Sequence, residues 1–126
     1  MGETRIRVRI KCRPEDERFE ELSLLVDTGA AYSWISGDIL RRLGVKPSRK
    51  VRFKTIEERV VERDVGHVFI EYEGETAPTT VVFAEKGDGS VFGLHGMESL
   101  GLEIDPTTGE IRKSEALLAL HTKQTR

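Results

Sequence analysis

One aspartate at the end of an apolar run restricts the fold more than any other feature of the sequence. Residues 22–26 are mostly apolar and lead directly into Asp27-Thr28-Gly29-Ala30. The apolar run predicts a strand, and the glycine allows a sharp turn just after it. Ser33-Trp34-Ile35 then resumes an extended pattern. We therefore expect a strand, a tight loop that holds the Asp27 carboxylate, and a second strand.

A loop of this kind can prepare a carboxylate for chemistry. Its exposed backbone N–H groups can donate hydrogen bonds to Asp27 and so fix the side chain. Two carboxylates brought within about 3 Å of each other cannot both ionise, so such a pair shares one proton. One member can then act as a base towards water and the other as an acid towards a substrate. The sequence contains one such loop, so a pair requires two copies of the chain.

The rest of the sequence predicts a mostly β domain. Apolar and basic residues alternate over residues 5–12, which is the period of a half-buried strand. Gly66 lies inside a long strand-like run, where we expect it to mark a bulge or a bend. Further strands are expected at residues 51–56, 60–72, 76–84 and 102–104.

Short helices are expected between these strands. Ser36 is a candidate N-cap, and Gly44 suits the left-handed position after the first helix. A second helix is expected at residues 97–100, and Ser114 could cap a third. The length of 126 residues fits one domain, with a core at about 5–113 and a short helix and tail at 114–126.

The order of these features resembles the retropepsin-like (retroviral-type) aspartic peptidases, in particular the single-domain prokaryotic and archaeal type. Residues 51–64 stand where that family places its flap, a hairpin that covers the substrate, and the resemblance extends over about residues 22–111. The motifs that carry it are the signature Leu25-Val26-Asp27-Thr28-Gly29-Ala30, the following Ser33-Trp34-Ile35, the hydrophobic-hydrophobic-glycine motif Val91-Phe92-Gly93, and the helix and strand of residues 97–105.

The resemblance implies a closed β-barrel of the acid protease fold and an aspartic endopeptidase that acts as a homodimer on peptides or unfolded proteins. Asp27 would be the catalytic residue. Thr28 would bond across the dimer, Gly29 would offer its N–H to the carboxylate pair, and Ala30 would complete the loop. In this family water attacks the substrate without a covalent intermediate, so neither a cofactor nor a metal is expected.

Two departures from the family pattern leave an alternative open. Viral members commonly carry a second acid where this sequence has Ala31, and their flap tips are rich in glycine. The expected tip here is Ile56-Glu57-Glu58-Arg59. By itself, this charged stretch could be an ordinary solvated turn. The alternative is therefore a non-proteolytic dimerisation or peptide-binding module with the same fold, which would bind extended segments by strand addition.

Composition narrows the classes of partner. The formal net charge is only −2, which favours neither nucleic acid nor an anionic membrane as a partner. A single cysteine, Cys12, and an N-terminus without an apolar signal segment favour the cytoplasm. The absence of Asn and the single Gln124 match the composition of heat-adapted proteins.

Several other residues have competing interpretations. The arginines at positions 5, 7 and 9 fit the solvated face of a strand better than a nucleic-acid stripe. Trp34 could be a packing anchor or part of a pocket wall, and Cys12 is expected to be a small core residue. The histidines lack the spacing of metal ligands and are expected to lie at the surface or to serve structural roles: His67, His95 and His121.

Overall fold

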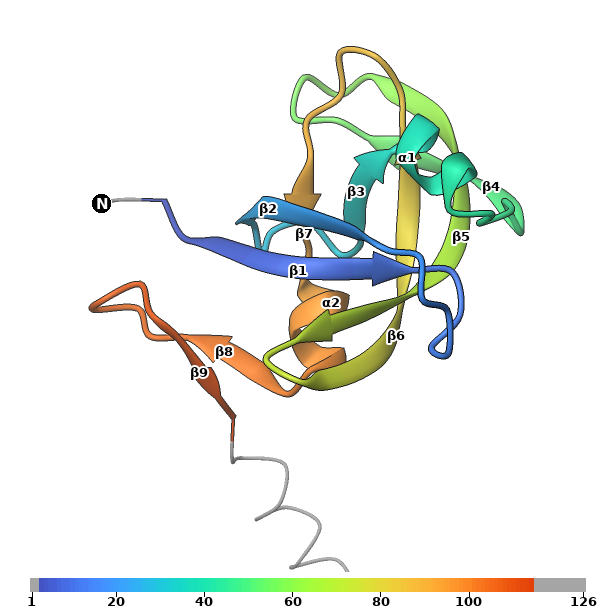
Figure 1. Ribbon diagram of the computed structural model, residues 1–126. Coiled ribbons are helices and arrows are strands. Elements are labelled where there is room, and N and C mark those ends of the chain that lie inside the picture. The colour runs from blue at the N-terminus through green and yellow to red at the C-terminus, as the bar shows by residue number, and fades with distance from the viewer. Residues whose placement is uncertain (1–2, 115–126) are drawn as a thin grey trace, which may run out of the picture.

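The strands of the computed structural model, which describes residues 3–114, form a seven-stranded sheet that closes on itself (Figure 1). The strand order is β1-β2-β7-β3-β6-β5-β4, and β1 also pairs with β5, which completes a ring. The closed, mostly β fold expected from the sequence is thus confirmed. The strands are β1 (Arg5–Lys11), β2 (Glu20–Val26), β3 (Ser33–Ser36), β4 (Arg49–Lys54), β5 (Val60–Tyr72), β6 (Glu75–Ala84) and β7 (Val91–Phe92).

Alternating side chains on the strands fill the inside of this ring. In β1, Ile6, Val8 and Ile10 are at most 2% exposed, whereas the arginines between them lie in solvent. These arginines pair with acids of neighbouring strands, for example Arg7 with Glu21 at 3.1 Å. The solvated face expected from the alternation is therefore what the structure shows. Other large, fully buried side chains of the core are Ile35, Leu40, Ile70, Phe83, Phe92 and Met97.

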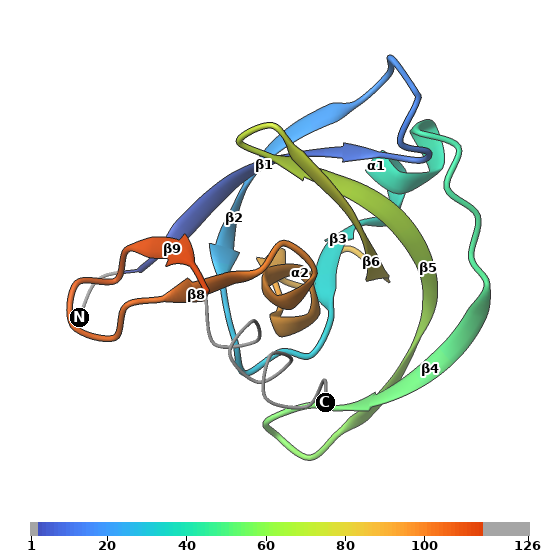
Figure 2. The ribbon, with the colours of Figure 1, turned by 90° about the horizontal axis from the view of Figure 1, so that it is seen from below.

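The long strand β5 pairs with different strands at its two ends. Its first half pairs with β4 to form a hairpin, and its end pairs with β1, so the strand curves around the ring (Figure 2). Gly66 pairs with Val81 in an unbroken register, so the bulge considered for this position is not present. The glycine instead admits the Lys46 carbonyl, which would lie 3.0 Å from an added Cβ.

Two short helices pack against the strands, and both contact β3 and β6. Helix α1 (Gly37–Arg42) follows Ser36, which occupies the N-cap position but makes no side-chain capping hydrogen bond. Gly44 lies just beyond this helix with φ of 88°, as its position predicted. Helix α2 (Leu94–Ser99) begins three residues earlier than the sequence suggested. The expected helix after Ser114 lies outside the described residues, and no helix within residues 3–114 is long and apolar enough to cross a bilayer.

A separate hairpin stands outside the ring, beside the start of β1 (Figures 1 and 2). It consists of β8 (Leu102–Ile104) and β9 (Ile111–Lys113), which form a two-stranded antiparallel sheet. Its turn is organised by Asp105, whose Oδ1 accepts hydrogen bonds from the backbone N–H groups of Thr107 and Thr108 at 2.8 and 3.2 Å. These bonds hold the pKa of Asp105 below its ordinary value.

A bidentate ion pair anchors the β4–β5 hairpin to the body of the protein. Arg63 of β5 donates to both carboxylate oxygens of Asp88, at 2.8 and 3.0 Å, and Asp88 also accepts the Glu85 backbone N–H at 2.8 Å. Both side chains are largely covered, at 15% and 18% exposure. The hydrogen bond from Arg63 lowers the pKa of Asp88, and the same contact raises the pKa of Arg63.

Replacing Asp88 should therefore destabilise the fold in a pH-dependent way. We expect Asp88→Asn to lower the free energy of unfolding by about 1–2 kcal/mol at neutral pH, because charged hydrogen bonds are lost. The pKa of Asp88 is depressed by folding, so the wild-type advantage is fully present above the unfolded-state pKa of about 3.9. It disappears as the pH falls through the lower folded-state value. Urea unfolding between pH 2 and 7 measures this difference.

Glu85→Gln is the matched control, since its carboxylate lies 3.6 Å from Arg63 but is 65% exposed. It should change the free energy of unfolding by less than about 0.5 kcal/mol. Equal effects of the two substitutions would show that the bidentate pair is not what holds the hairpin.

Candidate active site

The strand β7 organises the candidate site because it lies between the two strands that flank the Asp27 loop. It runs parallel to β2, with Val26 opposite Phe92, and antiparallel to β3, with Trp34 opposite Val91. The Asp27 backbone N–H donates to the Phe92 carbonyl at 2.9 Å, so the ladder continues into the loop. The chain between β2 and β3 therefore passes around the end of β7 and is anchored on both sides.

The loop holds the carboxylate of Asp27 at the surface of the single chain. The Gly29 backbone N–H donates to Asp27 Oδ1 at 2.9 Å, and the Ala30 N–H donates to the Asp27 carbonyl at 3.1 Å. Asp27, Thr28 and Gly29 are all exposed. One carboxylate oxygen is thus fixed by the backbone, while the side chain as a whole remains accessible.

Gly93 packs closely against the Asp27 loop. Its backbone N–H donates to the buried hydroxyl of Ser33 at 2.9 Å. The next N–H, that of Leu94, donates to the Ala30 carbonyl at 2.8 Å. A Cβ at position 93 would lie 2.5 Å from the Tyr32 backbone and 2.8 Å from the Ala30 carbonyl, so a side chain does not fit. The glycine of the hydrophobic-hydrophobic-glycine motif thus allows the start of α2 to approach the Asp27 loop closely.

A row of aromatic rings extends from the loop to the flap strand. Tyr32 packs edge-on against His95 at 5.0 Å and against Phe53 of β4 at 6.3 Å. Phe53 also lies 5.1 Å from Trp34, measured between ring centroids. Trp34 is half-buried and packs against Phe53, which agrees with the packing role expected for it. This aromatic row, Tyr32, Trp34, Phe53 and His95, was not expected from the sequence as a group.

The expected flap tip forms a tight turn between β4 and β5. The Thr55 N–H donates to the Arg59 carbonyl at 2.8 Å, and the Glu58 N–H returns to the Thr55 carbonyl at 2.9 Å. Glu58 adopts a left-handed φ of 64° in a position where glycine is common. Ile56 belongs to this turn rather than to the preceding strand, and its side chain is fully exposed. Glu57 and Arg59 are also exposed.

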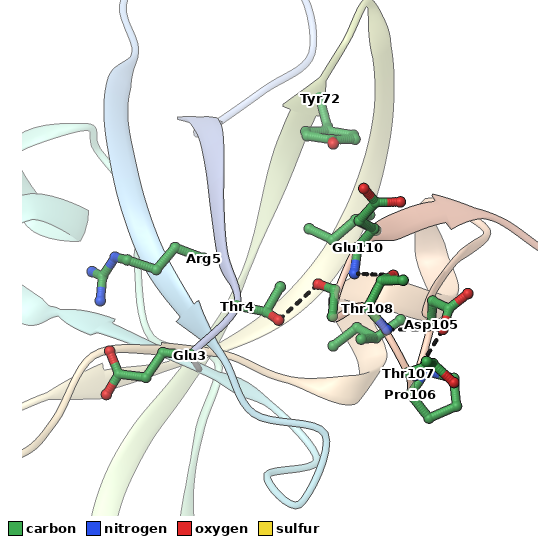
Figure 3. Close-up of a pocket in the computed structure, with 12 residues that line it drawn as sticks. Glu3, Thr4, Arg5, Tyr72, Asp105, Pro106, Thr107, Thr108 and Glu110 are labelled. Atoms are coloured by element: carbon green, nitrogen blue, oxygen red, sulfur yellow. Dashed lines mark hydrogen bonds between the residues drawn. The ribbon is translucent and has the colours of Figure 1, made fainter. Parts of the chain in front are cut away.

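A hollow of about 780 Å³ lies apart from the Asp27 loop (Figure 3). It is lined by the N-terminal segment and by the β8–β9 turn, and the Thr4 hydroxyl donates to the Gly109 carbonyl at 2.8 Å across it. No residue of the Asp27 loop lines this hollow. Within residues 3–114, no cluster of three His, Cys, Asp or Glu side chains is arranged to hold a metal ion.

Comparison with protein families agrees with this geometry. Residues 15–104 match the model of an aspartyl protease family. The chain belongs to this family. A search of curated proteins found no match. Among solved structures, the retropepsin-like chain is similar to the EIAV protease in complex with the inhibitor HBY-793, with 21% identity, a TM-score of 0.59, and coverage of 82% of this chain and 93% of the other.

These findings confirm two expectations. The family match and the structural likeness identify a retropepsin-like aspartic peptidase, and the likeness shows its fold. The catalytic role of Asp27, the supporting roles of Thr28, Gly29 and Ala30, and the flap role of residues 56–59 stay predictions. The structure does place the Asp27 loop, the motif Val91-Phe92-Gly93 and Phe53 of the β4–β5 hairpin next to one another.

The close approach at Gly93 predicts a strong effect of one methyl group. Gly93→Ala should lower the free energy of unfolding by about 1–3 kcal/mol, because the new Cβ meets rigid backbone atoms of the loop. Chemical unfolding monitored by circular dichroism measures the change.

Gly89→Ala serves as the control. No atom lies within 4 Å of its added Cβ, and its backbone is not left-handed, so its stability should stay within about 0.5 kcal/mol of the wild type. Similar stabilities of the two variants would contradict the packing described here.

Proposed function

We propose that the protein is an aspartic endopeptidase in which two chains each contribute one Asp27. The observation that carries the proposal is the Asp27 loop, whose carboxylate is held by the Gly29 N–H and exposed at the surface of the single chain. The family match to an aspartyl protease supports the same conclusion. Each chain has one such loop, so the site is complete only when a second copy brings its own Asp27 alongside.

The chemistry depends on sharing one proton between the two carboxylates. The charged Asp27 removes a proton from a water molecule as the water oxygen attacks the carbonyl carbon of the peptide bond. The protonated Asp27 donates a hydrogen bond, and then its proton, to the carbonyl oxygen. The tetrahedral diol then collapses: the carboxyl that took the water proton gives it to the leaving nitrogen, the other carboxylate takes back a proton from a diol hydroxyl, and the C–N bond breaks to give an acid and an amine. Because one carboxylate must be charged and the other protonated, the rate should pass through a maximum as pH varies.

The substrate would be an extended peptide segment, bound between the Asp27 loops and the flap hairpins. The aromatic row gives one wall of this cleft a large apolar surface, and Phe53 connects the wall to the flap strand β4. Such a wall favours apolar side chains near the cleaved bond, because burying them removes apolar surface from water. An unfolded protein or a flexible loop can present a segment of this kind.

Substitution of Asp27 tests the proposal most directly. Asp27→Asn should abolish cleavage of a peptide library or an unfolded protein, because a neutral amide cannot act as the base. The fold should persist, since the amide oxygen can still accept the Gly29 N–H. Mass spectrometry of cleavage products measures activity, and circular dichroism and sedimentation measure fold and mass.

The same substitution separates the enzyme from the non-proteolytic module. Calorimetry with a statine-type transition-state analogue should show tight binding to the wild type and a large loss in Asp27→Asn. Plain peptides that bind both proteins equally, with no cleavage by either, would instead support a peptide-binding module. Asp38→Asn is a suitable surface control, since that side chain is 89% exposed on α1.

The aromatic row leads to a prediction about substrate binding. Phe53→Ala removes the ring that joins Tyr32 and Trp34 to the flap strand. A contact between the Phe53 ring and an aromatic substrate side chain would be worth about 0.5–1.5 kcal/mol, so its loss should raise KM up to about tenfold, with a smaller change in kcat. Steady-state kinetics on a peptide with apolar residues around the cleaved bond measures both constants.

Phe19→Ala is the control, because Phe19 precedes β2 at the end opposite Asp27 and is 38% exposed. It should leave KM and kcat unchanged. If Phe53→Ala keeps the wild-type KM for such peptides, the aromatic row is not part of the substrate site.

A further inference from the structure

The strand β4 is an edge of the seven-stranded sheet. It pairs with β5 along its whole length, and within residues 3–114 no other strand pairs with it. Figure 2 shows β4 at the outer margin of the ring, with β5 beside it. The backbone N–H and C=O groups on the other side of β4 can therefore pair with an extended chain that is added there.

This edge is strongly basic. Residues 46–54 contain five basic residues and no acid, although the whole chain has a formal net charge of −2. The basic residues are Lys46, Arg49, Lys50, Arg52 and Lys54. Positive charge is thus concentrated on the one strand that has a free edge, and such a strand attracts acidic segments and repels basic ones.

The protein's own carboxylates neutralise only part of this charge. Lys50 bonds to a carboxylate of β5 at 2.9 Å. Lys54 comes only within 4.0 Å of Glu58, and both of these side chains are mostly exposed. Arg52 lies opposite Glu62 of β5, but it is exposed and forms no ion pair in the described part of the chain. Arg52 and Lys54 are therefore available to the acids of another molecule.

The two faces of β4 differ in the way that an added chain would have to match. Phe53 is half-buried and belongs to the aromatic row beside the Asp27 loop. Arg52 and Lys54, its two neighbours, are exposed. Successive side chains of a strand point to opposite faces, and paired strands keep this alternation in step. In a chain paired with β4, the residue opposite Phe53 would face the aromatic row, and its two neighbours would face Arg52 and Lys54.

We infer that the substrate is an extended acidic segment, which adds to the edge of β4 with an acidic residue on each side of an apolar one. The inference rests on the proposed function, because it names the class of substrate for that site. The order acid, apolar, acid holds for a parallel and for an antiparallel chain, since Arg52 and Lys54 flank Phe53 symmetrically. Opposite charges in directly paired positions stabilise the pairing, and like charges destabilise it.

The same charges exclude another occupant of this edge. Two β4 strands from two copies of the chain would place basic residues against basic residues, so they repel each other. A substrate segment rich in lysine or arginine meets the same repulsion. An acidic segment relieves it, so the charges act as a selection among extended chains and not only as a barrier to pairing.

Three peptides test the inference. They differ only in the two residues that flank one phenylalanine, and these are both Glu, both Gln or both Lys. The wild type should cleave the Glu peptide with kcat/KM about tenfold above that of the Gln peptide, and the Lys peptide more slowly still. The preference for Glu should shrink as the salt concentration rises from about 0.05 to about 0.5 M, because exposed charges are screened.

Substitutions on β4 locate the origin of this preference. Arg52→Gln and Lys54→Gln should each reduce the ratio of Glu to Gln cleavage to about threefold, and together to about one. Arg18→Gln is the matched control, because it removes one exposed positive charge from the loop between β1 and β2. It should keep the wild-type ratio. Circular dichroism spectra should be the same for all of these proteins.

Binding to Asp27→Asn separates this inference from the proposed function. Fluorescence anisotropy should show the Glu peptide bound about tenfold more tightly than the Gln peptide, and the difference should vanish when Arg52→Gln and Lys54→Gln are added. The same preference for Glu in a chain that never cleaves any peptide would uphold the acidic segment and remove the peptidase.

Other outcomes would overturn the inference. If the wild type cleaves the three peptides equally, or if the preference for Glu survives high salt or the double substitution, β4 does not select the substrate, while the peptidase remains. The basic residues would then only keep the edge strand from pairing. A chain that neither binds nor cleaves any of the peptides would contradict both proposals.

Discussion

The close approach between the end of β7 and the Asp27 loop is the constraint on which the rest of the site depends. Three backbone groups in sequence, those of Phe92, Gly93 and Leu94, bond to the loop or to the strand after it. They do so only because position 93 carries no side chain. Without this approach, α2 would not reach the loop. One glycine therefore connects the core of the ring to the proposed catalytic loop.

The same arrangement explains why a single chain would be an incomplete catalyst. In the single chain the Gly29 N–H donates to one oxygen of Asp27, and the side chain remains exposed to solvent. A second copy would change two things at once. It would bring a like charge close enough to force the sharing of a proton, and it would exclude solvent from the pair. Because each chain would contribute one Asp27, dimer formation and the assembly of the active site would be one event.

The sequence predicted the parts of this site that depend on local chemistry. The apolar strand before Asp27, the turn at Gly29 and the motif ending in Gly93 are readable because each requires particular residue types at adjacent positions. The aromatic row was missed because it depends on strand register: Phe53 reaches Tyr32 only through the pairing of β4 with β5. The sequence predicted that the strand continues through Gly66, but it could not show that the glycine makes room for the Lys46 carbonyl, because that carbonyl comes from a segment twenty residues away. Ser36 occupies the expected N-cap position without making the capping bond that its type suggested.

The turn expected to be the flap tip shows how a glycine-free turn can still be built. Glu58 holds a left-handed backbone, which costs an ordinary residue about 1–2 kcal/mol. The turn is stabilised by bonds between Thr55 and its neighbours, including the Arg59 N–H to the Thr55 hydroxyl at 3.2 Å. With the turn closed by its own hydrogen bonds, a substrate would meet the exposed Ile56 side chain rather than a flexible backbone. Closure of such a flap would then require the hairpin to move as a unit. The ion pair between Arg63 and Asp88 ties this hairpin to the loop between β6 and β7.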